Sequence, residues 1–407
     1  MADTVRLLTR LLAYEAGGPE PSPDAPLSDE DLRALYRLSK SQGLSHLVGH
    51  ALRRLGRLPE GEWAEAFDSQ TAQALWQSEN FTYECDRVCD CLSDGGIETL
   101  PLKGAVLRAY YPEPWMRTGC DIDILVREPQ LKQAVALLRE KLSYVPQYKG
   151  THDVVMTEPS GVHLELHFRL MESEEYGKAA LPLAAVWEKA VPCEAGNLRR
   201  RMPDDLFYYY HIAHMAKHFL NGGCGIRPFL DLWVLGHSSA FCADGTAPLL
   251  REGGLDAFAE RAETLCSVWF ADAPADDVSR EMESYLLRGG VYGGIGNAVV
   301  AGQVRRGGRL AYVLHRIWMP YDGLVRRYPS LDGRRWLTPF YQCRRWTEAV
   351  RFGRTRRGLR ELKVNASIGE DARCRTAALL AQLGLADAPP DTGAEKTQKT
   401  KKAKIQS

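Results

Sequence analysis

The 407-residue chain has no long uncharged apolar segment. A membrane-spanning helix needs roughly 18 or more consecutive apolar residues, and no such run occurs. The N-terminal stretch MADTVRLLTRLLAYEAGG carries charges throughout, which is typical of an amphipathic helix and not of a signal peptide. The chain has 45% apolar and 26% charged residues, which is ordinary for a globular protein. We expect a cytoplasmic protein of two or three domains without a membrane span.

The signatures of several common nucleotide-dependent enzymes are also missing. No expected strand is followed by Gly-x-Gly-x-x-Gly, which excludes a Rossmann oxidoreductase, and the P-loop and protein-kinase signatures do not occur. Of the ten cysteines only Cys85, Cys89 and Cys91 cluster, and no second ligand pair accompanies them. We therefore expect reduced, mostly buried thiols and no zinc site there.

Lysine is absent from one long basic segment. Residues 305–360 contain fifteen arginines, no lysine and three acids, with aromatic residues interleaved. Arginine and aromatic side chains together suit polyanions such as nucleic acid, nucleotide phosphates or an anionic lipid surface. The alternative is a set of solvated arginine faces on helices, neutralised by acids elsewhere in the fold.

Hydrophobic periodicity and turn residues divide the chain into four parts. These are a helical region at 1–96, a strand-containing core at 97–195, a C-terminal helical domain with the Arg-rich segment at 196–380, and a disordered Lys-rich tail at 381–407. Helices are expected over 29–58, 62–92, 105–111 and 129–142, and strands over 97–102, 121–126, 144–148, 153–157 and 162–168.

Two acidic residues interrupt the apolar strand at 121–126. Asp121 and Asp123 lie on the same face of that strand, because side chains alternate along a strand with a period of two. Burying each carboxylate without a partner would cost several kcal/mol, and a bound divalent cation is the usual compensation. The alternative, that both are exposed at a strand end, fits poorly with the apolar residues that flank them.

A third carboxylate lies on the strand at 162–168. There Val162, Leu164, Leu166 and Phe168 alternate with His163, Glu165 and His167. Asp121, Asp123 and Glu165 are therefore the expected catalytic residues and the expected ligands of Mg²⁺ or Mn²⁺. Glu165 is expected nearest the acceptor, either as a ligand or by helping to remove its proton.

Four further residues are expected to bind the substrate phosphates or line the cleft. Lys103 is a charge partner for phosphates and Gly104 lets the backbone approach them, although Lys103 also fits an ordinary surface lysine. Arg117 either clamps a phosphate or pairs with Asp121. His167 orients the acceptor or relays a proton, or is simply packed.

Three histidines share one face of a later helix. His211, His214 and His218 are spaced at i, i+3 and i+7, which fits a zinc site, a wall of the nucleotide cleft or plain helix packing. Asp231 follows as an acid that caps a helix or lies at a domain interface.

Several of these motifs resemble a known family. The stretch LPLKGAVLRAYYPEPWMRTGCDIDILV, the run from Tyr210 to His218, Gly225-Ile226-Arg227 and Asp231-Leu232 are similar to a bacterial group of uncharacterised nucleotidyltransferases within the DNA polymerase β superfamily. The similarity extends over about residues 30–350. It implies an α+β fold, in which a small mixed-sheet core is embedded between a helical N-terminal segment and a C-terminal helical domain.

The resemblance also implies an activity. The protein is expected to transfer a nucleotidyl group from an NTP to a hydroxyl or phosphate acceptor with Mg²⁺, releasing pyrophosphate. The superfamily usually has Gly-Gly or Gly-Ser where this chain has Lys103-Gly104, so Lys103 or Arg117 would replace the missing hydroxyl. The acceptor, a small molecule, a protein or an RNA, stays open. The alternatives are a nucleotide-binding accessory protein and a toxin-type nucleotidyltransferase acting on tRNA.

Overall fold

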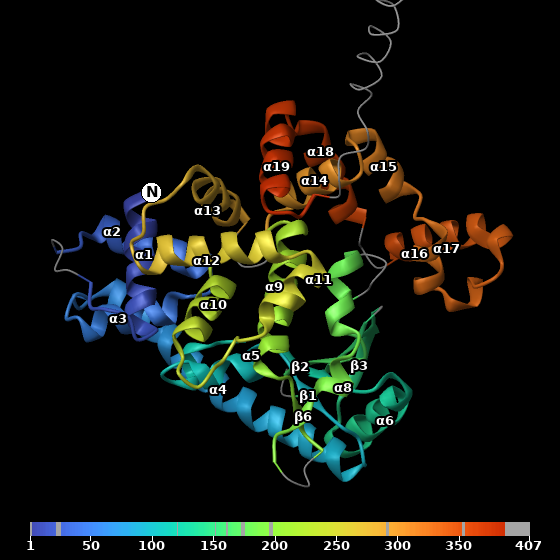
Figure 1. The fold of residues 1–407 in the computed structure, drawn as a ribbon, viewed down its shortest axis with the longest axis horizontal. Helices are drawn as coiled ribbons and strands as arrows, with labels where there is room; N and C mark the ends of the chain where they lie inside the picture. Colours follow the sequence, from blue (N-terminus) through green and yellow to red (C-terminus); the bar gives the residue numbers. More distant parts are fainter. Residues whose placement is uncertain are drawn as a thin grey trace, which may run out of the picture. The chain divides into compact units, whose positions relative to one another are not determined.

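The computed structural model describes residues 2–21, 26–119, 121–150, 152–159, 162–171, 176–194, 198–289, 293–351 and 355–386. Figure 1 labels its helices and strands along the ribbon. The chain forms two compact units. Unit 1 comprises Met1–Phe219 and Gly223–Gly293, and unit 2 comprises Leu220–Gly222 and Gly294–Ser407. The expected Lys-rich tail falls largely outside the described residues.

A five-stranded mixed sheet lies in unit 1 and has the order β1-β2-β5-β4-β3. Its strands are β1 (Leu100–Pro101), β2 (Asp121–Leu125), β3 (Val145–Lys149), β4 (Asp153–Thr157) and β5 (His163–His167). β2 and β5 run parallel, whereas the other neighbouring pairs are antiparallel. Because helices make up most of the remaining described chain, the expected α+β class is confirmed.

Two helices cover one face of this sheet. Phe81, Val88 and Leu92 of α4 (Glu62–Asp94) and Leu131 and Leu138 of α6 (Leu131–Leu142) pack on the alternate apolar residues of the central strands. Those strand residues are Ile122, Ile124, Leu164 and Leu166, all fully buried, with Val162 and Phe168 partly buried beside them. The alternation expected for the strand at 162–168 is confirmed, and its polar residues lie on the opposite face.

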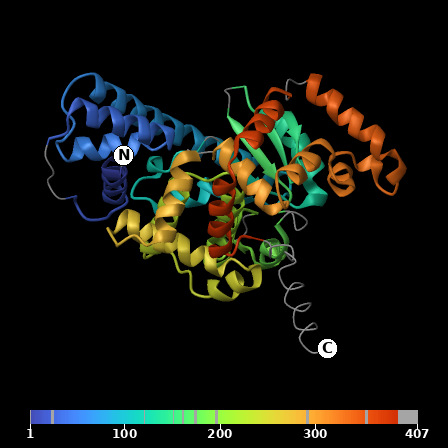
Figure 2. The same ribbon diagram turned by 90° about the horizontal axis from the view of Figure 1, so that it is seen from above.

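The N-terminal helices differ from the expectation at one point. α1 (Ala2–Glu15) packs on α2 (Asp29–Ser41) and α3 (Ser45–Arg54), which Figure 2 shows in blue. The helical stretch expected over 29–58 is divided into α2 and α3, because the chain breaks after Ser41 and Gly43 adopts a left-handed φ of 64°. Ser28 is the N-cap of α2 and forms a capping box with Asp31.

The expected strand at 97–102 is reduced to two residues. Pro101 has no N–H to donate to a ladder, and β1 accordingly lies at the sheet edge. The chain then turns at Lys103, whose φ is 44°, into the short α5 (Gly104–Leu107). Leu102, just before this turn, donates its backbone N–H to the carbonyl of Asp123. The hydrogen bond and the turn together place Lys103 directly beside β2.

Helices complete both units. Unit 1 continues with α8 (Val186–Lys189), the ribbon of β6 (Val191–Pro192) and β7 (Arg200–Arg201), α9 (Asp204–Leu220), α10 (Arg227–His237), α11 (Thr246–Gly253), α12 (Asp256–Phe270) and α13 (Asp277–Gly289). Unit 2 contains α14 (Ile295–Arg305), α15 (Arg309–Ile317), α16 (Tyr321–Arg327), α17 (Thr338–Arg351), α18 (Thr355–Ser367) and α19 (Glu370–Gln382).

Two expectations from composition are tested by the described residues. Within them, no helix combines the length and apolarity that crossing a membrane requires. Their cysteines are all free, as expected, but Cys193, Cys242, Cys343 and Cys374 are exposed, so the expectation of mostly buried thiols is wrong for these four.

Candidate active site

The register of β2 and β5 brings the expected acidic residues together. Asp123 is directly opposite Glu165, and Asp121 is opposite His163. Since the two strands are parallel and in register, residues with the same parity share the sheet face opposite α4 and α6. Carboxylates that are 42 residues apart in the sequence thereby become neighbours.

A tight cluster of polar side chains forms on that face. Oδ1 of Asp123 accepts from Nζ of Lys103 at 2.7 Å and lies 2.9 Å from Nε2 of His167. Oε2 of Glu165 lies 3.5 Å from the same His167 nitrogen and 3.9 Å from the Lys103 ammonium. One ligand atom each from Asp123, Glu165 and His167 fall within 4.8 Å of one another.

The charges of this cluster are strongly coupled. Burial alone would raise the pKa of Asp123, but Lys103 and His167 outweigh it and hold the pKa well below its usual range. Burial would likewise lower the pKa values of Lys103 and His167, yet their acidic partners raise both. Asp121 behaves differently: burial, followed by the charges of Asp123 and Glu165, raises its pKa to about 6.

Lys103 and Gly104 lie where the chain enters α5. The Lys103 side chain is 22% exposed and ion-paired, so it is not an ordinary surface lysine. Gly104 is buried, and a Cβ there would have Nη1 of Arg117 as its nearest neighbour, at 3.8 Å. The expected phosphate-binding pair therefore lies beside the carboxylates.

Arg117 has a partner that neither sequence alternative named. Its Nε donates to Oδ1 of Asp231 at 2.6 Å, and the Tyr111 hydroxyl donates to the same oxygen at 2.8 Å. The Arg117 side chain is 12% exposed and that of Asp231 is 1% exposed. This buried ion pair connects the loop before β2 to α10, so Asp231 does not cap a helix but anchors the loop that leads into the site.

Helix α9 supplies a further wall of the cluster. Burial raises the pKa of Tyr210, whose hydroxyl also interacts with the charges of Lys103, Asp123 and Glu165. His214 and His218 are paired through their Nε2 atoms at 3.1 Å, and burial, then Lys103, lowers both pKa values, that of His218 to about 4. Both imidazoles are therefore neutral near pH 7.

The three-histidine expectation is only partly met by this geometry. His211 makes a separate contact, because its Nε2 lies 2.9 Å from the carbonyl of Pro228. Of the options that the spacing left open, the pair His214 and His218 fits the wall of the cleft and His211 fits helix packing. The sequence analysis gave Tyr210 no role of its own, although it begins the run to His218 that resembles the family.

The family comparison agrees with this geometry. Residues 28–271 match the family model of an uncharacterised nucleotidyltransferase, which is more than half of the chain. The chain belongs to this nucleotidyltransferase family. No curated protein and no solved structure matches the chain. The expected resemblance is confirmed, although the match ends at residue 271 and does not extend to the expected limit of about 350.

All seven residues expected in the site of this nucleotidyltransferase lie inside the matched range, as do α9 and Asp231. Membership of the family makes the protein a transferase and implies, in general, that it uses an NTP and a divalent cation. The family match does not identify the acceptor.

The side chains present fit a divalent cation. Ligand atoms of Asp123, Glu165 and His167 lie within 4.8 Å of one another, a group that does not include the expected ligand Asp121. Asp121 is nevertheless in the field of the other two carboxylates, because burial and then the charges of Asp123 and Glu165 raise its pKa. Nδ1 of His167 is buried and has no hydrogen-bond partner among the described residues. Carboxylate oxygens suit Mg²⁺ and Mn²⁺, and an added imidazole ligand favours Mn²⁺ over Mg²⁺.

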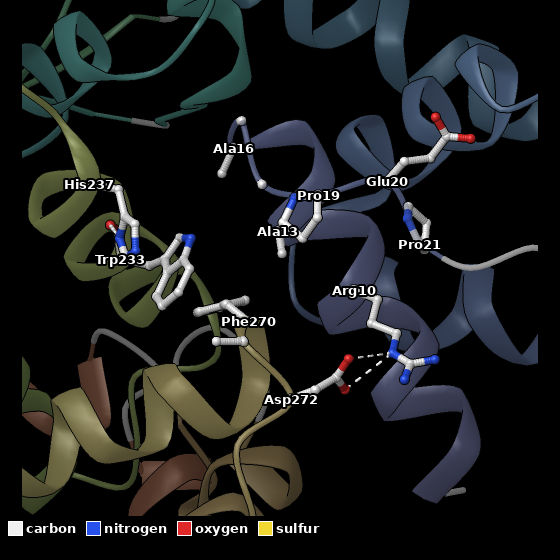
Figure 3. A pocket seen from close by; sticks show the side chains of 13 residues that line it. Arg10, Ala13, Ala16, Pro19, Glu20, Pro21, Trp233, His237, Phe270 and Asp272 are labelled. Carbon is white, nitrogen blue, oxygen red and sulfur yellow. Dashed lines mark hydrogen bonds and ion pairs between the residues drawn. The ribbon is translucent and has the colours of Figure 1, made fainter.

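A cavity of the nucleotidyltransferase lies elsewhere in unit 1. About 820 Å³ in volume, it is lined by the end of α1, Pro19–Pro21 and the ends of α10 and α12. Figure 3 shows Trp233, His237 and Phe270 on one side and the Arg10–Asp272 ion pair on the other. Its lining includes none of the expected site residues, so this cavity is separate from the acidic cluster.

Proposed function

We propose that this protein transfers a nucleotidyl group from an NTP to a hydroxyl or phosphate acceptor and releases pyrophosphate. The observation that carries the proposal is the cluster on β2 and β5, in which ligand atoms of Asp123, Glu165 and His167 lie within 4.8 Å of one another beside Lys103. Membership of a nucleotidyltransferase family supports the same reaction class.

Asp121, Asp123 and Glu165, with His167 beside them, are the residues proposed to hold Mg²⁺ or Mn²⁺. The cation, when bound, neutralises the triphosphate and polarises the acceptor oxygen. His167 hydrogen bonds to Asp123 and so fixes the orientation of that carboxylate. Because Asp123 has a strongly lowered pKa, it stays ionised and available as a ligand across the physiological pH range.

Lys103 and Gly104 are proposed to bind the phosphates. The Lys103 ammonium carries its charge at 2.7 Å from Asp123, so a triphosphate next to the carboxylates would lie within reach of a positive group. Glu165 is the more exposed of the paired carboxylates, with 28% of its side chain accessible against 5% for Asp123. It is therefore proposed to face the acceptor. Arg117 acts indirectly, by fixing the loop before β2.

Calorimetric titration of each NTP with Mg²⁺ or Mn²⁺ tests the proposal. Wild type is expected to bind an NTP only when the cation is present. In an acceptor screen with labelled NTP, Asp123→Asn and Glu165→Gln are each expected to lower turnover about 100-fold or more. Glu128→Gln is the matched control, because Glu128 is an exposed carboxylate of the same unit that pairs with Arg169. Equal binding and turnover by wild type and Asp123→Asn would contradict the proposal.

One observation favours a second function, nucleotide binding without turnover. The Lys103 ammonium already lies between Asp123 and Glu165, which is where a cation would compete with it. An accessory protein of this kind would bind an NTP equally well with and without a divalent cation, and would release no pyrophosphate with any acceptor in the same assay.

A further inference from the structure

One helix of unit 2 exposes an apolar stripe. On α15, Leu310 is 72% exposed, Leu314 56% and Ile317 45%, and their spacing of i, i+4 and i+7 places them on one face. Trp318, directly after the helix, is 48% exposed. The opposite side of the helix packs through Tyr312, which is buried. A helix that is apolar on its outer face needs a further partner for that face.

A second stripe follows on α17 and in the turn just before it. Phe340 and Val350 of α17 are 63% and 68% exposed, and Trp336, in the 3₁₀ turn Arg335–Leu337, is 78% exposed. Trp346 is 39% exposed and donates its indole N–H to the carbonyl of Ile317 at 3.2 Å. That bond joins the second stripe to the end of the first.

Other contacts fix the same junction. Arg345 donates to the Ile317 carbonyl at 2.6 Å, and Gln342 donates to the Met319 carbonyl at 2.6 Å. We call the combined region the basic apolar surface. It comprises Leu310, Leu314, Ile317, Trp318, Trp336, Phe340, Trp346 and Val350. With Leu359, these are nine of the fifteen large apolar side chains that are exposed in the described residues, so exposure of this kind is concentrated here.

Positive charge surrounds the basic apolar surface. Residues 305–360 have fifteen arginines against three acids, so the segment's own carboxylates cannot neutralise it. Arg309, Arg334, Arg335 and Arg351 are exposed on α15, on α17 or just before α17. Glu348 pairs with Arg327 and Arg344, which uses one of the three acids. The partner of this surface is therefore expected to be anionic.

Aliphatic side chains distinguish between the possible anionic partners. A nucleic acid binds arginine through its phosphates and aromatic rings through base stacking, but Leu310, Leu314 and Ile317 have no π-face to stack. A lipid interface binds aliphatic, aromatic and basic side chains together. Aliphatic groups leave water for the acyl region, tryptophan lies at the headgroup level, and arginine contacts anionic headgroups.

We propose that the basic apolar surface of unit 2 binds the surface of anionic lipid bilayers. The protein would lie on the membrane through α15 and α17 without crossing it. This surface lies beyond the family match, which ends at residue 271, and it contains none of the residues of the proposed active site.

Sedimentation of the full chain with lipid vesicles tests the proposal. Wild type is expected to bind vesicles that contain phosphatidylglycerol about tenfold or more tightly than vesicles of pure phosphatidylcholine, with weaker binding as salt rises from roughly 0.05 to 0.5 M. Tryptophan fluorescence should shift to the blue on binding, since Trp318 and Trp336 are exposed in the unbound protein. Equal binding to both vesicle types, or none, overturns the proposal.

A charge-preserving variant separates lipid from nucleic acid. Leu310→Gln/Leu314→Gln/Ile317→Gln keeps every arginine and alters exposed positions only, so it should fold and lose about tenfold or more in vesicle affinity. The matched control is Leu75→Gln/Trp76→Gln on α4, where the side chains are 45% and 66% exposed, and it should bind as wild type. Undiminished vesicle binding by the triple variant overturns the proposal.

Two other occupants appear as distinct outcomes of the same experiments. Tight binding of single-stranded RNA by wild type and triple variant alike, without vesicle binding, would assign the surface to nucleic acid. A wild-type dimer that the triple variant converts to a monomer, again without vesicle binding, would assign it to a second copy of the chain. Either result overturns the lipid proposal. Trp336→Ala/Phe340→Ala provides an independent variant should the triple variant fail to fold.

Discussion

Asp121 and Asp123 lie two residues apart on one strand face, yet their surroundings give them opposite electrostatic roles. Lys103 and His167 both contact Asp123, which stabilises its charge although the side chain is 5% exposed. Asp121 is in the field of two other carboxylates, and its pKa is raised to about 6 by burial and by that repulsion. In the absence of a cation, therefore, the two aspartates should respond differently to neutralisation.

Neutralising Asp121 should stabilise the metal-free protein while reducing activity. The pKa of Asp121 is about 6 in the folded chain against an ordinary value of 3.8. The folded state therefore binds the Asp121 proton more tightly than the unfolded state does. Ionisation of Asp121 lowers the stability of the folded state, and this loss is complete above about pH 6. Two pKa units correspond to about 3 kcal/mol, an upper bound for the gain in Asp121→Asn at pH 8. The gain should shrink as the pH falls from 6 to 4. Urea unfolding at pH 4 and pH 8 measures it.

Asp123→Asn provides the contrasting control. It leaves the Lys103 ammonium without its 2.7 Å partner in a largely buried position, so we expect a loss of stability at pH 8. The electrostatic account of the cluster would be wrong if both substitutions destabilised the metal-free protein equally. It would also be wrong if the effect of Asp121→Asn did not change with pH.

At the scale of elements, strands and helices with a strong period could be predicted and their breaks could not. β2 and β5 follow from two-residue alternation, and α4 and α6 follow from their apolar faces. The break at Gly43 and the two-residue length of β1 depend on turn geometry and edge position, which periodicity does not report. Elements with one face in the apolar core beside the sheet carry the clearest pattern.

The candidate site divides in the same way. Asp123, Glu165 and His167 could be predicted to share a face, because alternation within β2 and β5 fixes their direction. The Arg117–Asp231 pair could not, since its members are 114 residues apart and only tertiary packing brings α10 to the loop. The position of α9 over the cluster is likewise a tertiary result, which is why Tyr210 had no sequence-based role.

Loss of the α10 anchor should destabilise unit 1. Asp231→Asn removes the charge that pairs with Arg117 and leaves a buried guanidinium uncompensated, for an expected cost of about 3–5 kcal/mol. Asp272→Asn is the matched control, because Asp272 also accepts from arginines but its side chain is 44% exposed. That variant should change stability by about 1 kcal/mol or less. Denaturant unfolding measures both, and equal effects would refute a structural role for the buried pair.

At the scale of the molecule, the proposed chemistry and the proposed membrane contact lie in different units. The whole acidic cluster, α9 and the Arg117–Asp231 anchor belong to unit 1, and the basic apolar surface belongs to unit 2. Each unit has its own apolar cluster, one around β2 and β5 and the other around Leu324, Tyr328, Leu331 and Tyr341. Net charge is zero for the chain, but the Arg-rich segment lies entirely within unit 2.

Because each unit has its own core, the two units should unfold in separate transitions. Binding of an NTP should raise the temperature of only one of them. Calorimetry of the full chain is expected to resolve two transitions, because each unit buries its own apolar residues. At about 100 times its Kd, an NTP with Mg²⁺ or Mn²⁺ adds about 2.7 kcal/mol to the stability of the unit that binds it, which should raise that transition by several degrees.

Gly222→Ala identifies the other transition. Gly222 has a φ of 120°, and a Cβ would lie 2.8 Å from the Gly294 carbonyl, within unit 2. This substitution should lower the transition that the NTP leaves unchanged. A single transition, or equal shifts of both with the NTP, would show that the units do not unfold independently.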